Sequence, residues 1–269
     1  MLKREIPSSK ELIPVAGLGS WAKFETDKPA VRSVLKLFVE HDGKLIDTSP
    51  MYGNAEQAIG NLTTELRIAD KLFYATKVWT TGRDAGVNQM ESSMRKMKRS
   101  QLDLIQVHNL VDWQTHLKTL KQWKQEGKIR YTGITHYTTS SHDLLEQIIK
   151  SEDIDFIQFN YSIRIRNAEQ SLLQTARDRG VAVIINEPLE KGSLFKMVKG
   201  KPLPAWAAEN DMNSWAQFFL KYVIAHPAVT CVIPATRRVD HMEENMGALR
   251  GRLPDAKMRG RMARYAENV

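Results

Sequence analysis

Eight short apolar segments, rich in β-branched residues, alternate along the chain with longer stretches of mixed polarity. Each segment is apolar at consecutive positions, which is typical of strands buried on both faces in a parallel sheet. The predicted strands cover residues 15–18, 44–47, 72–76, 104–107, 131–134, 156–159, 181–185 and 229–233.

The stretches between these strands repeat apolar residues with the period of a helix. Val31, Val34 and Phe38 belong to one such stripe, and Pro29 suits its first turn. Further stripes cover residues 117–123, 144–149 and 172–176. Eight strands alternating with helices in 269 residues predict an α/β fold, the (β/α)8 barrel of the TIM type. An open sheet of six strands is the competing architecture.

Two segments lie outside the alternation. Residues 3–14 predict a β-hairpin that caps the bottom of the barrel, and residues 186–212 form a long insertion of the kind that is often functional. A helix is expected near the end of the chain. No linker or low-complexity segment divides the sequence, so we expect one barrel domain over residues 1–269.

Composition narrows the class of protein. Hydrophobic residues make up 42% and charged residues 26%, which excludes a collagen, a disordered tail and a small disulfide scaffold. Cys231 is the only cysteine, so no internal disulfide can form, and we expect no metal site. No apolar run reaches the length of about 18 residues that a membrane span needs. Residues 1–7 lack the apolar stretch of a signal peptide, so we expect a cytoplasmic protein unless an export signal was removed.

The net charge of +8 comes from 39 Lys and Arg residues against 31 Asp and Glu residues. A basic surface attracts anionic partners or cofactors. The densest basic stretches, residues 95–99 and 250–264, carry Met and Ala between the charges. We interpret both as solvated helix faces, and we expect neither a nucleic acid nor a membrane as partner. The oligomeric state stays open, and a monomer is compatible with the sequence.

Residues 17–22 match the G-x-G-x-x-A pattern of dinucleotide-binding proteins, and Asp47 ends the next predicted strand. That motif requires a helix to begin at its second glycine. Residues 23–28 carry no helical stripe, and the first good stripe begins near Pro29. We therefore reject the open dinucleotide-binding sheet.

Polar side chains close three consecutive predicted strands. Asp47 ends the second strand, with Tyr52 five positions later, and Lys77 and His108 follow the third and fourth strands. The carboxyl ends of barrel strands carry the chemistry, so all four residues are expected on one rim. Each residue alone has a structural explanation, such as a helix cap, a loop aromatic, a salt bridge or a satisfied polar group.

Together these four side chains suit proton donation to a carbonyl oxygen. A tyrosine has an ordinary pKa near ~10, and an adjacent lysine ammonium lowers that pKa. Asp47 would keep Lys77 charged, and a neutral His108 would donate a hydrogen bond to the substrate. Such an acid needs hydride delivered to carbon, which implies a nicotinamide cofactor. A barrel lyase or hydrolase with Lys77 as a Schiff-base amine is an alternative that leaves Tyr52 idle.

The segments around these residues resemble those of the aldo-keto reductase family. In family order they are residues 17–21, 47–53, 75–79, 103–109, 127–134, 158–161 and 233–237, then 244–245. The resemblance spans nearly the whole chain and implies an NADP(H)-dependent reductase of small aldehydes or ketones, with NAD(H) less favoured. It makes Tyr52 the general acid, assisted by Lys77 and Asp47, with His108 orienting the carbonyl. An NADPH-binding regulatory or sensor subunit with little turnover is the alternative.

The resemblance also assigns the binding sites position by position. The cofactor-binding residues would be Gly19, Ser20, Trp21, Asp47, Thr135, His136, Gln158, Asn186, Pro188, Leu189, Gly192, Ile233, Pro234, Ala235, Thr236, Arg237, His241, Glu244 and Asn245. The candidate walls of a rather open substrate pocket are Trp21, Trp79 and Trp113, which could instead pack at the rim.

The nicotinamide positions and the pyrophosphate positions each depart from the family pattern. Asn186 stands where an aromatic residue often stacks on the nicotinamide, and His136 stands where the family usually has Asn. Glu187 and Glu190 bring carboxylates near anionic cofactor groups, and Lys191 would offset one of them.

The adenosine 2′-phosphate position is the third departure. Ala235 and His241 occupy positions where many members hold this phosphate with Lys and Arg. Arg237 and Arg238 could supply the charge instead, because a guanidinium matches phosphate geometry. Such a contact would favour NADP(H) over NAD(H).

Overall fold

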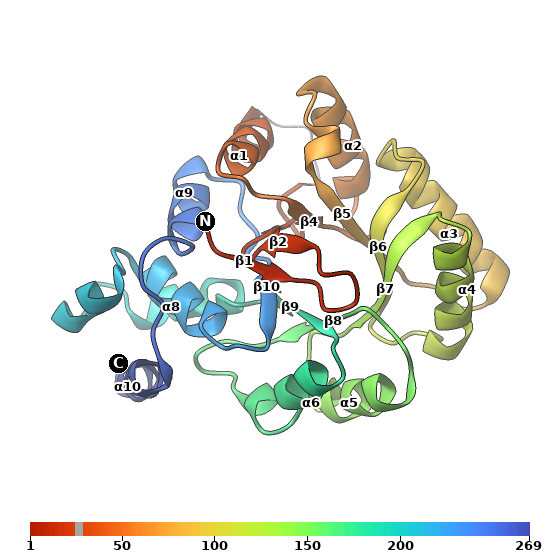
Figure 1. Cartoon of the computed structure of the whole chain (residues 1–269). Coiled ribbons are helices and arrows are strands. Elements are labelled where there is room, and N and C mark those ends of the chain that lie inside the picture. The colour runs from red at the N-terminus through yellow and green to blue at the C-terminus, as the bar shows by residue number, and fades with distance from the viewer. Residues whose placement is uncertain (25–28) are drawn as a thin grey trace.

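The computed structural model of the chain describes residues 1–24 and 29–269. Eight parallel strands stand side by side in chain order and form the central barrel that Figure 1 shows in end view. The strands are β3 (Leu18–Gly19), β4 (Leu45–Asp47), β5 (Phe73–Val78), β6 (Leu102–His108), β7 (Ile129–Thr135), β8 (Phe156–Asn160), β9 (Ala182–Asn186) and β10 (Val229–Val232). The barrel closes through backbone bridges from Ala16 to Val232 and from Gly19 to Ala235. The predicted (β/α)8 architecture is confirmed, and the open six-stranded sheet is wrong.

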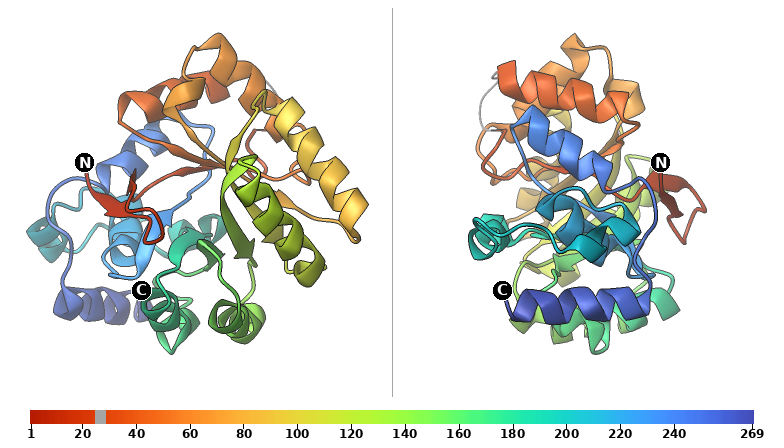
Figure 2. Two further views of the ribbon diagram at one scale, coloured as in Figure 1. Left: turned by 45° about the vertical axis from the view of Figure 1, so that its right-hand side comes forward. Right: turned by 90° about the vertical axis from the view of Figure 1, so that its left-hand side faces the viewer.

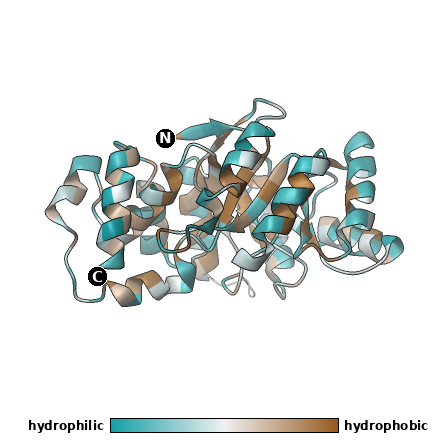
Figure 3. Ribbon diagram, turned by 90° about the horizontal axis from the view of Figure 1, so that it is seen from below, coloured by the Kyte–Doolittle hydropathy of each residue, from teal (hydrophilic) through white to brown (hydrophobic). Residues whose placement is uncertain are grey.

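Helices surround the barrel and present polar faces to solvent, while the strands at the centre are apolar (Figures 1 and 3). The α-helices are α1 (Pro29–Glu40), α2 (Ala55–Glu65), α3 (Arg83–Lys96), α4 (Trp113–Gln125), α5 (His142–Ser151), α6 (Leu172–Asp178), α7 (Ser193–Met197), α8 (Trp215–Ile224), α9 (Val239–Gly247) and α10 (Ala256–Glu267). Short 3-10 helices are η1 (Ala69–Lys71), η2 (Thr139–Ser141), η3 (Asn167–Glu169), η4 (Glu190–Gly192) and η5 (Ala205–Asn210). The expected terminal helix is α10, which lies along the outside of the molecule (Figure 2). Within residues 1–24 and 29–269, no helix is long and apolar enough to cross a membrane.

An amino-terminal hairpin closes one end of the barrel, as predicted. Its strands β1 (Lys3–Glu5) and β2 (Leu12–Pro14) pair antiparallel, and the hairpin lies across that end in Figures 1 and 2. Fully buried Ile6 and Ile13 pack against the side chains inside the barrel. Those inner side chains are Leu45, Phe73, Ala75, Leu104, Tyr131, Phe156, Ala182, Ile184, Cys231 and Ile233. The barrel interior is therefore hydrophobic next to the hairpin, and a polar site within the barrel lies toward its opposite end.

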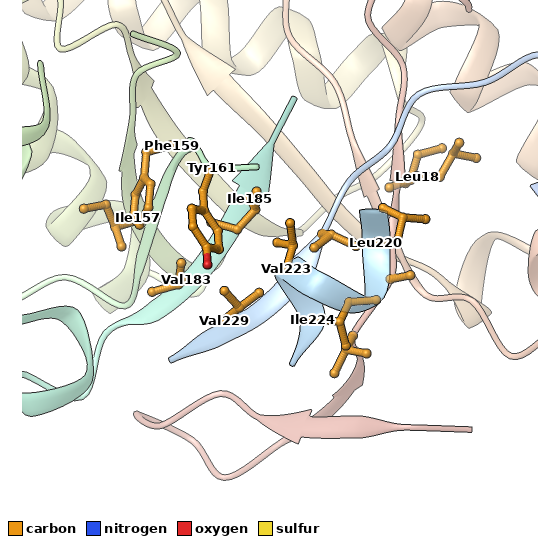
Figure 4. Packing of buried hydrophobic residues seen from close by; sticks show 14 of the residues in the cluster. Leu18, Ile157, Phe159, Tyr161, Val183, Ile185, Leu220, Val223, Ile224 and Val229 are labelled. Atoms are coloured by element: carbon orange, nitrogen blue, oxygen red, sulfur yellow. The ribbon is translucent and has the colours of Figure 1, made fainter. Parts of the chain in front are cut away.

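The outer faces of the strands form a second apolar layer against the helices. Figure 4 shows Ile157 and Phe159 of β8 and Ile185 of β9 in this layer, which also contains Leu220 and Val223 of α8. Successive side chains of a strand point to opposite faces, so the residues between these positions point into the barrel. This alternation decides which side chains meet at the open end.

Gly17 lies directly before β3, the strand that closes the barrel, and Gly19 is its last residue. A Cβ atom at Gly17 would lie 2.6 Å from Leu45 O, and one at Gly19 would lie 2.7 Å from Ile233 O. These glycines therefore permit close strand approach rather than forming a phosphate-binding turn. Residues 20–24 are not helical, and the first α-helix of the described residues begins at Pro29, which agrees with the rejection of the dinucleotide-binding motif. Residues 25–28 of the intervening segment lie outside the described part of the chain.

Candidate active site

The strand alternation brings the predicted catalytic residues together at the carboxyl end of the barrel. Asp47, Lys77 and His108 each come two or four positions after an inward-facing apolar residue of β4, β5 or β6. They are therefore inward as well, and all three are nearly inaccessible to solvent, with exposed fractions of 2%, 1% and 6%. The β4–α2 loop then turns through Ser49 and returns Tyr52 to the same place.

Lys77 is the centre of this group. Its ammonium donates hydrogen bonds to Asp47 Oδ2 at 2.6 Å and to the Thr48 carbonyl at 2.7 Å. The same Nζ atom lies 5.2 Å from the centroid of the Tyr52 ring. Burial works against the charge, but the attraction of Asp47 and Tyr52 outweighs it and raises the pKa of Lys77. Lys77 is therefore held as an ammonium beside the phenol.

Two amides complete the layer beneath the ion pair. Gln106 Nε2 lies 3.4 Å from Asp47 Oδ1 and donates to Gln158 Oε1 at 2.8 Å. Gln106 pairs in register with Lys77 across β5 and β6, so it faces inward at the same level. The sequence reasoning missed Gln106, although its place two residues before His108 on one strand is a signal that could have found it.

Tyr52 lies partly buried between Lys77 and His108. The rings of Tyr52 and His108 make an edge contact, with centroids 5.9 Å apart and planes at 84°. Burial raises the pKa of Tyr52, and the opposing effect of Lys77 does not cancel it. The expected net lowering of this pKa is wrong because desolvation of the phenolate is the larger effect. Tyr52 is thus protonated throughout the neutral range, as a proton donor must be.

His108 is a neutral imidazole. Burial lowers its pKa to about 3, and the charge of Lys77 and the nearby His136 act in the same direction. Its Nδ1 atom lies 3.1 Å from the hydroxyl oxygen of Ser49. Ser49 is a second residue that the sequence reasoning missed, although it stands inside the segment that carries Asp47 and Tyr52.

The predicted cofactor residues follow neighbouring strands on the other side of the rim. Several backbone contacts join them: Ser20 N donates to Asp47 O at 3.0 Å, His136 N donates to Gln158 O at 3.0 Å, and Gly19 bridges Ala235. The strands concerned are β7, β8, β9, β10 and β3, which are consecutive around the barrel. The two predicted groups therefore share one rim, with the catalytic group after β4, β5 and β6.

Two buried polar atoms on this arc have no hydrogen-bond partner among the described residues. They are Ser20 Oγ and Asn186 Oδ1, and Asn186 Nδ2 donates to His136 O at 3.3 Å. A nicotinamide cofactor offers polar groups that would satisfy such atoms. The residues on this arc therefore fit a polar cofactor, although Asn186 offers no aromatic face for stacking.

Both acidic residues of the loop after β9, Glu187 and Glu190, have partners. Glu187 Oε1 lies 3.0 Å from Lys191 Nζ. Glu190 accepts hydrogen bonds from the Ser162 hydroxyl at 2.6 Å and the Ser193 hydroxyl at 3.0 Å. Arg164 lies 3.8 Å from the same carboxylate. The expected offset by Lys191 is confirmed, and Glu190 has partners that the sequence did not reveal.

The two candidate arginines for the 2′-phosphate differ in their surroundings. Arg238 donates from Nε to Asp240 Oδ1 at 3.0 Å and from a second nitrogen to Oδ2 at 2.5 Å. Arg237 is exposed and has no ion-pair partner among residues 1–24 and 29–269. Thr236 accepts a hydrogen bond from the Arg238 amide at 3.0 Å. Arg237 is therefore the arginine available to a ligand.

The three candidate tryptophans differ as well. Trp21 and Trp79 are 49% and 41% exposed, as walls of an open mouth would be. Trp113 begins α4 and packs half-buried against the outer core. The Gln89 amide pairs with the Trp79 backbone in both directions, at 2.6 Å and 3.1 Å. Trp79 is therefore held in place, whereas a role for Trp113 in the pocket stays a prediction.

The fold and this rim define a barrel protein equipped for proton donation at the carboxyl ends of its strands. The family model for the aldo/keto reductase family matches residues 16–261. The chain belongs to the aldo/keto reductase family.

Its relatives and structural neighbours agree with this assignment. The chain is 26% identical to "Methylglyoxal reductase YeaE" of Escherichia coli over 91% of its length and 89% of the relative's. It is 30% identical to "Uncharacterized oxidoreductase C215.11c" of Schizosaccharomyces pombe, covering 87% and 78% of the two chains. An aldo-keto reductase from Klebsiella pneumoniae, solved with NADPH, superposes with a TM-score of 0.82 at 24% identity, covering 99% and 96%.

Proposed function

We propose that this protein reduces small aldehydes or ketones to alcohols, with NADPH as hydride donor and Tyr52 as proton donor. The observation that carries the proposal is the buried Lys77 ammonium, 2.6 Å from Asp47 Oδ2 and 5.2 Å from the centre of the Tyr52 ring. 2-Oxoaldehydes are the first substrates to test, because one relative is a methylglyoxal reductase.

The chemistry of each side chain follows from its surroundings. Bound NADPH supplies the hydride that reduces the substrate carbon. Tyr52 donates its hydroxyl proton to the carbonyl oxygen as negative charge develops there. Lys77 stabilises the phenolate that Tyr52 becomes, and Asp47 holds Lys77 in place. His108 is neutral and donates a hydrogen bond to the same oxygen, which orients the carbonyl.

The arc from β7 to β3 would hold the dinucleotide. Ser20 and Asn186 carry the unpartnered polar atoms, and the charge of His136 contributes to the lowered pKa of His108. Arg237 would bind the 2′-phosphate and favour NADPH over NADH. Pro188, Leu189 and Gly192 would cover the pyrophosphate, and Glu244 and Asn245 would contact the adenine.

A matched pair of variants tests the cofactor preference. Arg237→Ala should weaken NADPH binding by about tenfold or more and leave NADH binding nearly unchanged, because it removes a charge-assisted contact to phosphate. Arg238→Ala should change both affinities little, since Arg238 is engaged by Asp240. Tryptophan fluorescence quenching measures all four affinities. Equal losses in the two variants would contradict the assignment.

The proposed acid is tested by NADPH consumption with a panel of aldehydes and ketones. Tyr52→Phe should lower kcat/KM by about a hundredfold or more, because the proton donor is gone. Tyr265→Phe on α10 is the matched control, since Tyr265 packs against Trp206 and Trp215 away from the rim. Full activity in Tyr52→Phe would show that another group donates the proton.

Two other functions make distinct predictions. A regulatory or sensor subunit would bind NADPH tightly and turn over no member of the panel, so rapid multiple turnover eliminates it. A Schiff-base enzyme needs a neutral lysine amine, whereas Asp47 and the Thr48 carbonyl hold Lys77 as an ammonium with a raised pKa. Borohydride should therefore trap no substrate adduct on Lys77.

We further propose that the chain works as a single cytoplasmic domain. One outer apolar cluster runs from Val15 to Ala266, which supports a single domain over residues 1–269. Cys231 is fully buried and packs within the inner apolar cluster of the barrel. Residues after all eight strands meet on the rim of one chain, which is compatible with an active monomer. Sedimentation tests whether the protein is a monomer, and cell fractionation tests whether it is cytoplasmic.

A further inference from the structure

We propose that Ser49 is a positioning residue that fixes His108 in the tautomer carrying its proton on Nε2. In this form the imidazole presents an N–H donor to the substrate carbonyl. The inference deepens the proposed function and rests on it for the role of His108 in catalysis. The arrangement of the imidazole protons is a separate property that can be measured without any substrate.

The geometry places one hydroxyl against one ring nitrogen. Ser49 Oγ lies 3.1 Å from His108 Nδ1, and the Ser49 side chain is fully buried. The other ring nitrogen, Nε2, makes no hydrogen bond to residues in the described part of the chain. The ring itself is fixed by its edge contact with Tyr52.

Counting protons decides the direction of the Ser49–His108 hydrogen bond. Ser49 Oγ accepts the backbone N–H of Met51 at 3.4 Å through one of its two lone pairs, which leaves its hydroxyl proton to be placed. This proton needs an acceptor, and among the described residues His108 Nδ1 is the acceptor that Ser49 Oγ reaches. If Nδ1 carried the proton instead, the buried Ser49 hydroxyl would lose that acceptor and carry a desolvation penalty.

The remaining proton of the neutral ring follows from this direction. A neutral imidazole has one N–H, and the hydrogen bond at one nitrogen fixes which nitrogen bears it. With Nδ1 accepting from Ser49, the proton is on Nε2. Burial lowers the pKa of His108 to about 3, so the ring is neutral near pH 7 and carries the single N–H that this argument places.

The end of β4 and the loop after it therefore position three groups of the site. Asp47 ends β4, Ser49 begins the turn, and the Tyr52 amide donates to Ser49 O at 3.0 Å within that turn. The same short segment thus contributes the carboxylate, the hydroxyl and the phenol. Ser49 contacts the imidazole rather than the substrate position, so its effect on the reaction passes through His108.

Nitrogen-15 NMR of the histidine side chains tests the tautomer directly. The chain has 7 histidines, and His108→Gln identifies the His108 signals by their disappearance. We expect a proton-bearing Nε2 and a proton-free Nδ1 in the wild type, and a mixture of both tautomers in Ser49→Ala. Ser49→Thr keeps the hydroxyl and should restore the wild-type spectrum. A proton on Nδ1 in the wild type, or a pure Nε2–H form in Ser49→Ala, overturns the proposal.

Kinetics then separate positioning from simple structural support. Ser49→Ala should lower kcat/KM roughly tenfold, and the same substitution in a His108→Gln background should have almost no further effect. Ser93→Ala is the matched control, since Ser93 is a buried serine on α3 that bonds to Gln89 O. Equal losses from Ser49→Ala in both backgrounds would show a role independent of His108. Absence of carbonyl reduction in every protein would instead reject the proposed function and leave the NMR result standing.

Discussion

At the scale of single residues, the site depends on a charged pair held out of water. Lys77 and Asp47 are 1% and 2% exposed and 2.6 Å apart. Breaking such a pair by removing one partner leaves an uncompensated buried charge. Burying this pair costs stability, and we interpret its role as holding the Lys77 charge beside the Tyr52 phenol.

Removing Lys77 alone should thus be worse for stability than removing the whole pair. Lys77→Met should lower the free energy of unfolding by about 3–5 kcal/mol, because it leaves the Asp47 carboxylate unpaired. Adding Asp47→Asn should recover most of that loss without restoring NADPH consumption. Urea denaturation followed by fluorescence measures the stability of both variants. A double variant no more stable than Lys77→Met would contradict this account.

The pH dependence follows from two pKa shifts with opposite directions. The pKa of His108 falls to about 3, so the ring keeps its neutral form above that value. The pKa of Tyr52 is raised by burial, so the phenol keeps its proton through the neutral range. Carbonyl reduction should therefore be nearly constant from about pH 5 to about pH 9 and fall only in alkali. An inflection near neutral pH that disappears in His108→Gln would contradict the assignment.

Residue types at strand ends were readable from the sequence, but their partners were not. Asp47, Tyr52, Lys77 and His108 were predicted because a barrel gathers strand ends on one rim. Gln106 and Ser49 were missed because their contacts depend on register and on the path of a loop. Lys77 faces Gln106 only through the pairing of β5 with β6.

At the scale of elements, helices fix the loops that would shape the pocket. The segment from Trp79 to Gly82 follows β5 and receives side-chain hydrogen bonds from two helices and a loop. Besides Gln89, Asp112 accepts from the Gly82 amide at 2.8 Å, and His116 Nε2 lies 2.7 Å from Thr80 O. The backbone that carries the exposed Trp79 ring is thus held in place by these hydrogen bonds.

Gln89→Leu should remove two of the hydrogen bonds that hold the Trp79 backbone and leave Tyr52 unaffected. We expect KM for bulky aromatic aldehydes to rise severalfold, because Trp79 no longer holds one position, while kcat for a small 2-oxoaldehyde changes little. Gln122→Leu on α4 is the control, since the Gln122 amide donates to Glu126 Oε1 on an exposed face. Steady-state kinetics measure KM and kcat for both aldehydes. The same KM for the bulky aldehyde in Gln89→Leu and Gln122→Leu would contradict the account.

The long insertion shows where sequence patterns fail. Residues 186–212 were expected to be a loop, and they contain η4, α7 and η5. The carboxyl end of η5 is fixed by Lys221 of α8, whose Nζ donates to Asn210 O at 2.6 Å and to Arg252 O at 3.1 Å. Such long-range contacts to backbone carbonyls leave no periodic signal in the sequence.

Lys221→Met should therefore destabilise the fold by about 2–4 kcal/mol, because buried carbonyls lose their donor. The affinity for NADPH should change far less than the stability. Lys118→Met on the exposed face of α4 serves as the control. Equal denaturation midpoints for the two variants would show that the Lys221 contacts carry no net stabilisation.

At the scale of the whole molecule, the barrel has one end that is closed by apolar side chains and one end that carries the polar residues of the site. The hairpin and the apolar inner layer seal one end of the barrel, and the residues after the eight strands form the other end. Both features were predictable, because alternation of strands and helices has few compact solutions in a chain of this length. The central claim is that the open end transfers a proton and a hydride to a carbonyl group.

The most direct test follows the transferred hydrogen. The wild-type protein is incubated with a small 2-oxoaldehyde and NADPH deuterated at the transferring position, and the product is examined by mass spectrometry. The account predicts an alcohol with one deuterium on the former carbonyl carbon, formed over many turnovers. An unlabelled product, or no alcohol despite bound NADPH, would contradict it.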